Sequence, residues 1–525
     1  MLNRTVTRVW PDEPETRHRL LTIRNDLVAE RGAVGTTIDG DSSRAIAVAG
    51  CSVDVSFEQA SGPFESYERT VTSSDGDLVE RTNFRLRIPW FGWLFVLPVW
   101  AHLGRRGRLV SASGSSAGPP WWAPPDRIDQ RQALVLGLLA AASMSSAFTN
   151  TLFTQTAQFA AKDFGVGNFG FSVAGAVVRA GIVIALPFTI FADRVGRARV
   201  MRITAWTAPI VTATGALAPT FPILVVTQAI GRPIGLALDI LIAVVVAEEM
   251  PRNSRAYAVS VMAMAAGLGA GVAVMALPLA DLGAGGWRLV YVVTLIWLVV
   301  AVDITRRLPE TVRFERKHVI APRIDRHRLG LLATVAASAN FFVAPASVFQ
   351  NRYLSDIRGF DAGAISLFTL TTATPAGFGL VIGGRLADVR GRKFLIAIAV
   401  PVATVLLLTS FLVDGPPMWA AAFGGGFVGG IALPALSVYR AELFPTGNRG
   451  RASGLLTASA LLGGSIGLLL VGRLLDLGWS YGQAIGLVAL AQIVVVVLVL
   501  TRFPETAHRE LEDLNPLDRQ AATLI

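Results

Sequence analysis

The chain has 525 residues, of which 52% are hydrophobic and 16% are charged. Ordinary soluble domains carry about 25% charged residues, so this composition excludes a conventional soluble enzyme and predicts that the protein is not an enzyme. The formal net charge is +10, and the single cysteine, Cys51, excludes both an intramolecular disulfide bond and a cysteine-ligated metal site.

Residues 1–110 are more polar than the rest of the chain and contain the alternation of polar and apolar side chains that is typical of half-buried strands. Residues 52–57 alternate in this way, and residues 84–88 alternate apolar side chains with arginines. Residues 73–76, Ser-Ser-Asp-Gly, are typical of a hairpin turn. We therefore predict a small cytoplasmic α+β extension over residues 1–110, with an ordered extension that has no function of its own as the alternative.

Residues 88–103 are apolar and contain three tryptophans, but two prolines and a glycine interrupt them. An α-helix needs roughly 20 residues to cross a bilayer, so this segment is too short to span one. Because arginines follow it, we expect it to lie in the interface of the inner leaflet. Residues 111–130, rich in Ser, Gly and Pro, are predicted to be a flexible linker.

The remainder of the chain is a succession of apolar stretches, each close to the length of a membrane-spanning helix. Backbone groups inside a bilayer must satisfy their own hydrogen bonds, so these stretches predict an all-α helical bundle. The twelve predicted helices cover residues 132–158, 169–192, 200–218, 222–247, 255–280, 287–305, 329–353, 363–387, 394–413, 416–441, 452–474 and 480–502.

The basic residues of the loops predict the orientation, because Lys and Arg stay on the cytoplasmic side during insertion. Alternate loops carry about nineteen basic residues on one side and about five on the other. Both termini are therefore expected in the cytoplasm, in a multi-pass protein of the cytoplasmic membrane. Much of the positive charge is explained by topology, so we expect the lipid bilayer and no nucleic acid among the partners.

Three sequence elements occur twice at a nearly constant spacing of 194 or 195 residues. The central acids of these pairs are Asp193 and Asp388, Glu248 and Glu442, and Glu310 and Glu505. The spacing predicts two parallel six-helix repeats over residues 131–310 and 329–505, an arrangement in which a transport site forms between the halves. Residues 311–328 would be a basic cytoplasmic loop, and residues 506–525 a cytoplasmic tail.

The first of these pairs resembles the signature loop of the major facilitator superfamily. The pattern Gly-x-Leu-Ala-Asp-Arg-x-Gly-Arg-Lys is matched over residues 384–393 except at Val389, and the loop around Asp193 matches it less fully. The Glu-x-x-Pro-x-x-x-Arg and Pro-Glu-Thr elements are similar to those of the sugar-porter and metabolite:proton symporter branch. The resemblance covers residues 130–510 and implies a transporter that works by alternating access.

Charged residues recur at the predicted cytoplasmic helix ends of both halves. Opposite charges clustered there can hold the ends together in one state and release them in another. The resemblance implies such a gate, and charges that serve only topology are the alternative. The predicted gating residues are Asp193, Arg194, Arg197, Glu248, Arg255, Glu310, Asp388, Arg392, Glu442, Arg449 and Glu505.

Charges inside the predicted helices point to function because they are costly in a bilayer. Arg179 lies in the second helix, and Arg232 and Asp239 lie on one face of the fourth, roughly 10 Å apart along its axis. We predict that Arg232 contacts a substrate anion or the gate. Burial would raise the pKa of Asp239, which makes it the candidate proton-binding acid. A mutually compensating pair or snorkelling side chains are the alternatives.

Uncharged polar residues complete the predicted substrate pathway. They are Asn150 and Gln158 in the first helix and Asn340, Gln350 and Asn351 in the seventh. The first helix lacks the acid usual in proton-coupled sugar transporters, and the seventh lacks the glutamine pair of sugar binders. The substrate class therefore stays open between an organic acid, a sugar and a similar metabolite.

These observations predict a monomeric secondary active transporter that takes up a small polar metabolite, with the proton gradient as its energy source. The chain has no phosphate-binding loop of the Gly-x-x-x-x-Gly-Lys-Ser/Thr type, and we expect no cofactor and no metal. Two alternatives remain. One is an uncoupled facilitator or an exporter of the same fold, and the other is a transporter-like sensor whose N-terminal domain is the output.

Overall fold

The computed structural model describes residues 4–32, 53–74, 76–104, 120, 122–124, 126–251, 254–283, 285–310, 324–444 and 449–506. The chain forms two compact units. The first unit comprises residues 1–143, 241–265 and 302–314, and the second comprises residues 144–240, 266–301 and 315–525. Most of the predicted linker, basic loop and C-terminal tail lies outside the described residues.

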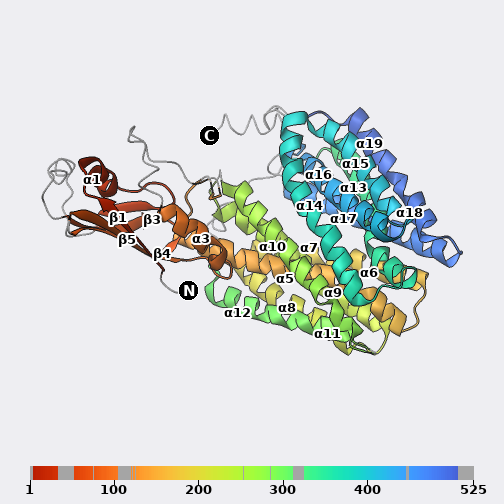
Figure 1. Ribbon diagram of the computed structural model, residues 1–525. Helices are drawn as coiled ribbons and strands as arrows, with labels where there is room; N and C mark the ends of the chain where they lie inside the picture. The colour runs from red at the N-terminus through yellow and green to blue at the C-terminus, as the bar shows by residue number, and fades with distance from the viewer. Residues whose placement is uncertain are drawn as a thin grey trace. The chain divides into compact units, whose positions relative to one another are not determined.

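The N-terminal part of the first unit is a five-stranded antiparallel sheet in the order β1-β5-β4-β3-β2, drawn in red to orange in Figure 1. The strands are β1 Arg4–Pro11, β2 Ala29–Gly32, β3 Asp54–Ser61, β4 Phe64–Ser74 and β5 Asp77–Leu86. The predicted hairpin turn joins β4 to β5, where Ser74 pairs with Asp77. Gly76 in this turn has a φ angle of 84°, a conformation that glycine adopts without steric cost.

One face of the sheet is buried beneath α1 Pro14–Leu21 and α3 Gly92–Leu103. Every second residue of β5 from Leu78 to Leu86 is buried, as the two-residue period of a strand requires. Two apolar clusters form on this face. Leu20 of α1 packs in one of them with Leu78, and Val99 of α3 packs in the other with Leu86.

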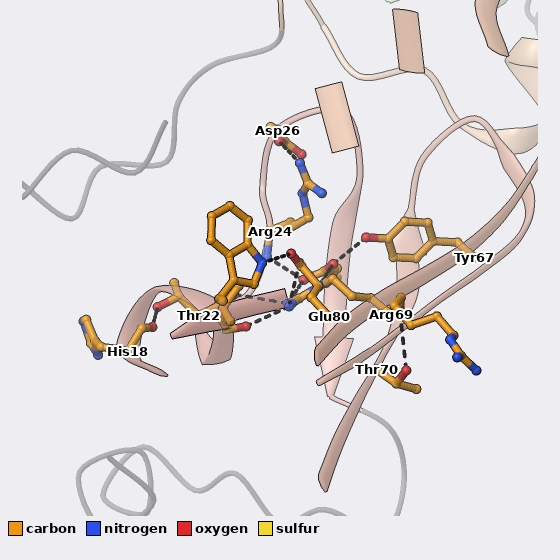
Figure 2. Close-up of polar contacts among 12 residues, drawn as sticks. His18, Thr22, Arg24, Asp26, Tyr67, Arg69, Thr70 and Glu80 are labelled. Carbon is orange, nitrogen blue, oxygen red and sulfur yellow. Dashed lines mark hydrogen bonds and ion pairs between the residues drawn. The ribbon is translucent and has the colours of Figure 1, made fainter. Parts of the chain in front are cut away.

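Charged side chains are also buried on this face (Figure 2). Arg69 of β4 donates from Nε and Nη2 to the two carboxylate oxygens of Glu30, both at 2.7 Å. The Tyr67 hydroxyl donates to the same carboxylate at 2.6 Å. Burial alone would lower the pKa of Arg69, but the Glu30 carboxylate raises it above its usual value. The pair therefore stays ionised inside the domain.

A second group of charges connects α3 to the loop before β2. Asp26 accepts hydrogen bonds at 3.0 Å from Nη2 of Arg24 and at 3.0 Å from the ring of His102 in α3. Burial alone would raise the pKa of Asp26, but the hydrogen bond with His102 and the charge of Arg24 hold it well below its usual range.

The sheet is joined to helices of the first unit by direct contacts. Arg127 donates to the side chain of Asn25 at 2.5 Å and to the backbone oxygen of Asp26 at 3.3 Å. The indole of Trp90 donates to Asp303 at 3.1 Å. Trp90 has a φ angle of 64°, which costs energy for a residue with a Cβ atom, so its backbone is held by the structure around it.

The rest of the described chain is helical (Figure 1). The α-helices are α5 Gln130–Asp163, α6 Asn168–Ala180, α7 Ala185–Val195, α8 Arg197–Ala213, α9 Phe221–Glu249, α10 Arg255–Met275, α11 Trp287–Val293, α12 Leu298–Arg307, α13 Arg326–Asp356, α14 Ala362–Arg390, α15 Arg392–Thr409, α16 Gly415–Glu442, α17 Arg449–Asp476, α18 Tyr481–Ala489 and α19 Ala491–Arg502. Short 3₁₀ turns separate α6 from α7 and α11 from α12.

Nine helices among the described residues are long and apolar enough to cross a membrane. All nine coincide with predicted segments. The predicted segments at 169–192, 200–218 and 363–387 are also helical, but they are outside those nine. The first of them is interrupted by the 3₁₀ turn Gly181–Ile184, which shortens its α-helical parts.

Small residues allow close helix packing in the second unit. In α17, a Cβ atom at Gly463 would lie 2.2 Å from the backbone oxygen of Ala337 in α13, and one at Gly467 would lie 2.2 Å from that of Phe341. Only glycine permits this approach. The backbones of α13 and α17 therefore pack directly against each other, as is common between membrane helices.

Candidate functional site

Arg179 of α6 reaches α13 and α17 within the second unit. A Cβ atom at Gly464 of α17 would lie 3.4 Å from Nη1 of Arg179 and 3.4 Å from the backbone oxygen of Asn340. The position at Gly464 is closely packed, because a Cβ atom there would also lie 2.8 Å from the Cβ atom of Ala344 in α13. The amide of Asn340 is directed to its own helix and donates to the backbone oxygen of Ala336 at 3.4 Å.

Arg232 of α9 is partly buried, and its Nε atom is buried without a hydrogen-bond partner among the described residues. Arg179 is also partly buried, and the end of its helix packs on α9, since a Cβ atom at Gly181 would lie 2.5 Å from the backbone oxygen of Ala229. Within the part of the chain that the structure describes, neither guanidinium group forms an ion pair. Two positive charges therefore lie here without a carboxylate partner in the part of the chain that the structure describes.

Asp239 lies seven residues after Arg232 on α9, and the two side chains are not paired. Asp239 is exposed, whereas its neighbours Leu238 and Leu241 are buried. The role of Asp239 as the proton-binding acid stays a prediction.

Polar groups of α5 face α9. The hydroxyl of Ser146 donates to the backbone oxygen of Gly235 at 2.8 Å, and the amide of Asn150 donates to that hydroxyl at 3.3 Å. The side-chain oxygen of Asn150 is buried without a partner among the described residues, as are both amide atoms of Gln158. Unsatisfied polar atoms inside a helical bundle are costly, so they mark where water or a ligand would bind.

Asn351 connects α13 to α5. Its side-chain amide donates to the side chain of Gln155 at 2.7 Å and to the backbone oxygen of Gln155 at 3.2 Å. Asn351 is buried, and the adjacent Gln350 is partly buried. Gln155 is not among the predicted pathway residues, although it lies about one helical turn before Gln158 in a polar stretch of α5.

The predicted gating residues Arg392 and Glu505 lie together. The Glu505 carboxylate accepts backbone N–H groups of Arg392 and Lys393, both at 3.0 Å, at the N-terminus of α15. The buried guanidinium group of Arg392 hydrogen-bonds Thr506. Gly391 has a φ angle of 93°, and a Cβ atom there would lie 3.0 Å from Glu505. The Pro-Glu-Thr segment is therefore fixed to the signature loop.

In the first unit, Arg131 of α5 connects the ends of two other helical segments. Its guanidinium group donates to the backbone oxygen of Glu310 at 2.7 Å and lies 3.4 Å from the carboxylate of Glu249. Glu310 is one of the predicted gating residues, but Arg131 is not, and the prediction named Glu248 instead of the adjacent Glu249. The sequence places Glu248 and Glu249 at the end of one predicted helix and Arg131 at the start of another. It does not indicate which of these charged side chains would be in contact.

The remaining gating predictions concern residues whose placement is only partly described. Arg197 begins α8 directly after Gly196, and Glu248 lies in the last turn of α9. Six further side chains lie outside the described part of the structure, and their backbones are at helix ends. These are Asp193, Arg194, Arg255, Asp388, Glu442 and Arg449.

Comparison with known proteins identifies the family. The model of the major facilitator superfamily matches residues 136–320 and 329–522. The chain belongs to the major facilitator superfamily. It is a multi-pass membrane transporter of this superfamily and not an enzyme. A relative from Haemophilus influenzae, provisionally named a metabolite transport protein, is 26% identical over 347 residues, which cover 62% of this chain and 84% of the relative.

Solved structures of the superfamily have the same fold. A bacterial homolog of the human lysosomal transporter Spinster, inward-facing and unoccupied, matches 70% of this chain and 94% of its own, with a TM-score of 0.54 and 18% identity. The proton:xylose symporter XylE matches 73% of this chain and 98% of its own, with a TM-score of 0.55 and 16% identity. A nucleoside transporter matches 70% of this chain and all of its own, with a TM-score of 0.58 and 12% identity.

Proposed function

We propose that the protein is a secondary active transporter that takes up a small polar metabolite across the cytoplasmic membrane by alternating access. In this proposal it acts as a monomer without a cofactor or metal, and both termini are cytoplasmic. The observation that carries the proposal is the set of unsatisfied polar atoms inside the helices. The Nε atom of Arg232, the side-chain oxygen of Asn150 and the amide of Gln158 are buried without described partners. Such groups are expected along a substrate pathway.

We also propose twelve membrane-spanning helices in two parallel repeats, over residues 131–310 and 329–505. Gly196 and Gly391 support this layout. They lie 195 residues apart, each directly precedes a helix, and their φ angles are 112° and 93°. Alternating access would then arise from rocking of the two halves.

The proposed cytoplasmic gate depends on how the loops are fixed within each half. The contacts of Glu505 with Arg392 and Lys393 support a rigid connection between α15 and the end of α19. In the first half, Arg131 connects the start of α5 with Glu249 and Glu310. Each half can then move as a body, and charges at the loop surfaces can pair in one state and separate in the other.

Proton coupling through Asp239 can be tested directly by measuring uptake. The full chain is reconstituted in proteoliposomes and supplied with a panel of metabolites, while uptake and internal pH are recorded with a pH gradient imposed and then collapsed. We expect uptake that depends on the gradient. Asp239→Asn should abolish the proton-linked part while leaving substrate exchange, because the amide cannot carry the proton.

The matched control is Asp414→Asn, which makes the same chemical change at an exposed side chain outside the helices. It should transport like the unaltered protein. Proton-linked uptake that survives Asp239→Asn would exclude Asp239 as the coupling acid and favour a facilitator or exporter. Ligand binding without any flux by the full chain would contradict transport itself and favour a sensor.

A further inference from the structure

We infer that Arg179 and Arg232 form a binding site for an oxyanion, so that the transported metabolite carries a carboxylate or phosphate group. This inference depends on the proposed transport function, because it assigns the substrate class of the same pathway. It is carried by the depth of the two residues, by the direct packing of the end of α6 on α9, and by the lack of ion pairs at either guanidinium group among the described residues.

The two arginines lie at matching depths. Each is the twelfth residue of its helix, α6 or α9, and under the proposed topology both helices begin on the same side of the membrane. At 1.5 Å per residue, the twelfth position is about 17 Å from the helix start. That distance places both arginines near the middle of a hydrocarbon core of about 30 Å. Snorkelling carries the charge of residues near helix ends to the interface, and these positions are far from the ends.

Two like charges at this depth need compensation. The end of α6 packs directly on α9, since a Cβ atom at Gly181 would lie 2.5 Å from the backbone oxygen of Ala229. No ion pair reaches either guanidinium group among the described residues. Asp239, the acid on the same helix face, is seven residues from Arg232 and does not pair with it. An uncompensated buried charge is strongly unfavourable, so a mobile anion that enters between the arginines would lower the free energy of the site.

The donors fit an oxyanion. Arg179 forms no ion pair among the described residues, and the Nε atom of Arg232 is a buried donor without a described partner. Guanidinium groups bind carboxylate and phosphate oxygens in a planar, two-point geometry. The buried side-chain oxygen of Asn150 is an unsatisfied acceptor near α9, and it could accept from a hydroxyl group of the same substrate.

The test measures binding and flux separately on the full chain. Lactate, succinate, citrate and inorganic phosphate are the anionic probes, and xylose and mannitol are the neutral ones. Binding is followed as the shift in melting temperature of purified protein, and flux is followed in proteoliposomes. We expect at least one anion to bind and be transported. Comparison of the carboxylates with phosphate then identifies which oxyanion the site accepts.

Arg179→Gln and Arg232→Gln should each weaken anion binding about tenfold or more, because each removes charge-assisted hydrogen bonds. Arg232→Lys keeps the charge but loses the two-point geometry, so it should bind with intermediate affinity. Arg473→Gln is the control, since the side chain of Arg473 is exposed in the last turn of α17 and forms no hydrogen bond or ion pair among the described residues. Size-exclusion chromatography checks that each variant is folded.

Two outcomes separate this inference from the proposed function. If only neutral probes are transported, and the two glutamine variants transport them normally, the protein is a transporter and the anion site is refuted. If an anion raises the melting temperature in an arginine-dependent manner without flux, the site stands and transport is refuted. No arginine-dependent shift with any anionic probe also overturns the inference.

Discussion

Glu30 and Arg69 are the clearest case in which single residues determine the stability of the N-terminal domain. Both side chains are completely buried, and the two charges share two hydrogen bonds of 2.7 Å. The guanidinium group also donates to the backbone oxygen of Leu20 at 2.7 Å and lies 4.0 Å from the ring centre of Phe57. The pair therefore ties β2, β4 and the end of α1 together at the centre of the sheet face.

Removal of one partner would leave the other charge buried. We predict that Glu30→Gln destabilises the domain by about 3–5 kcal/mol, the usual cost of breaking a buried ion pair. Hydrogen exchange of the β4 and β5 peptides, measured by mass spectrometry on the full chain, should accelerate strongly. Glu58→Gln is the control, because Glu58 lies on the same sheet but forms an exposed ion pair with Arg31. Equal exchange in the two variants would refute the prediction.

The ion pair between Glu30 and Arg69 could not be predicted from the sequence. Glu30 and Arg69 are 39 residues apart, and their contact depends on the position of β2 beside β3 and on the register of β4. An arginine among the alternating residues of a strand is ordinarily on the solvent face. Nothing in the local pattern distinguished Arg69 from the exposed charged residues beside it.

The helix α3 has two different faces. Val99 and Leu103 are buried against the sheet, whereas Trp93, Leu97 and Trp100 are exposed on the opposite side, Leu97 to 74%. The exposed residues follow one another at spacings of four and three, so they share a face. Exposed tryptophan and leucine together are unusual for a surface in contact with water.

The start of α3 lies beside membrane helices of the same unit. Pro89 packs on Gly137 of α5, where a Cβ atom would lie 2.5 Å from the proline ring. Trp90 reaches Asp303 in α12. The start of α3 is therefore held beside α5 and α12, two helices that we expect in the membrane-spanning part of the chain. We propose that the inner surface of the bilayer covers the apolar face of α3, with its tryptophans at the level of the lipid headgroups.

Fluorescence tests this placement. A fluorescent label attached to Leu97→Cys in a Cys51→Ser background should show blue-shifted emission and quenching by lipids that carry a nitroxide near the headgroup. The same label at Glu68→Cys, an exposed position on β4, should remain in water and escape quenching. Equal emission and quenching at the two positions would show that the α3 face is not in the interface.

At the level of elements, the sequence predicts secondary structure well where one pattern of apolar residues continues over many positions. The long apolar stretches predicted the helices, and the alternation in residues 52–57 predicted β3. β1 and α1 were not predicted, because each has only eight residues and several of them are charged. Interactions with the rest of the sheet, such as the pairing of β1 with β5, stabilise these short elements.

At the level of the whole molecule, the repeat in the sequence explains more of the gate than of the substrate site. The contact of Glu505 with the loop at Gly391 follows from motifs that lie in the repeat. The neighbours of Arg179 do not, because Gly464 lies in the middle of α17, fifteen residues after the motif residue Arg449, and Asn340 lies in α13, which carries no motif. Membrane helices of similar composition can pack with several neighbours, so composition alone did not indicate which of them would meet.

The connection between the sheet domain and the membrane helices provides the last prediction. Arg127 and Trp90 hold the domain to the start of α5 and to α12 through Asn25 and Asp303. If the domain is an attachment rather than the output of a sensor, the double variant Trp90→Phe, Arg127→Ala should keep its flux. Hydrogen exchange in residues 22–32 should increase, because two contacts of the domain are lost. Loss of flux in a variant that elutes as intact protein would instead assign the domain a direct role in the transport cycle.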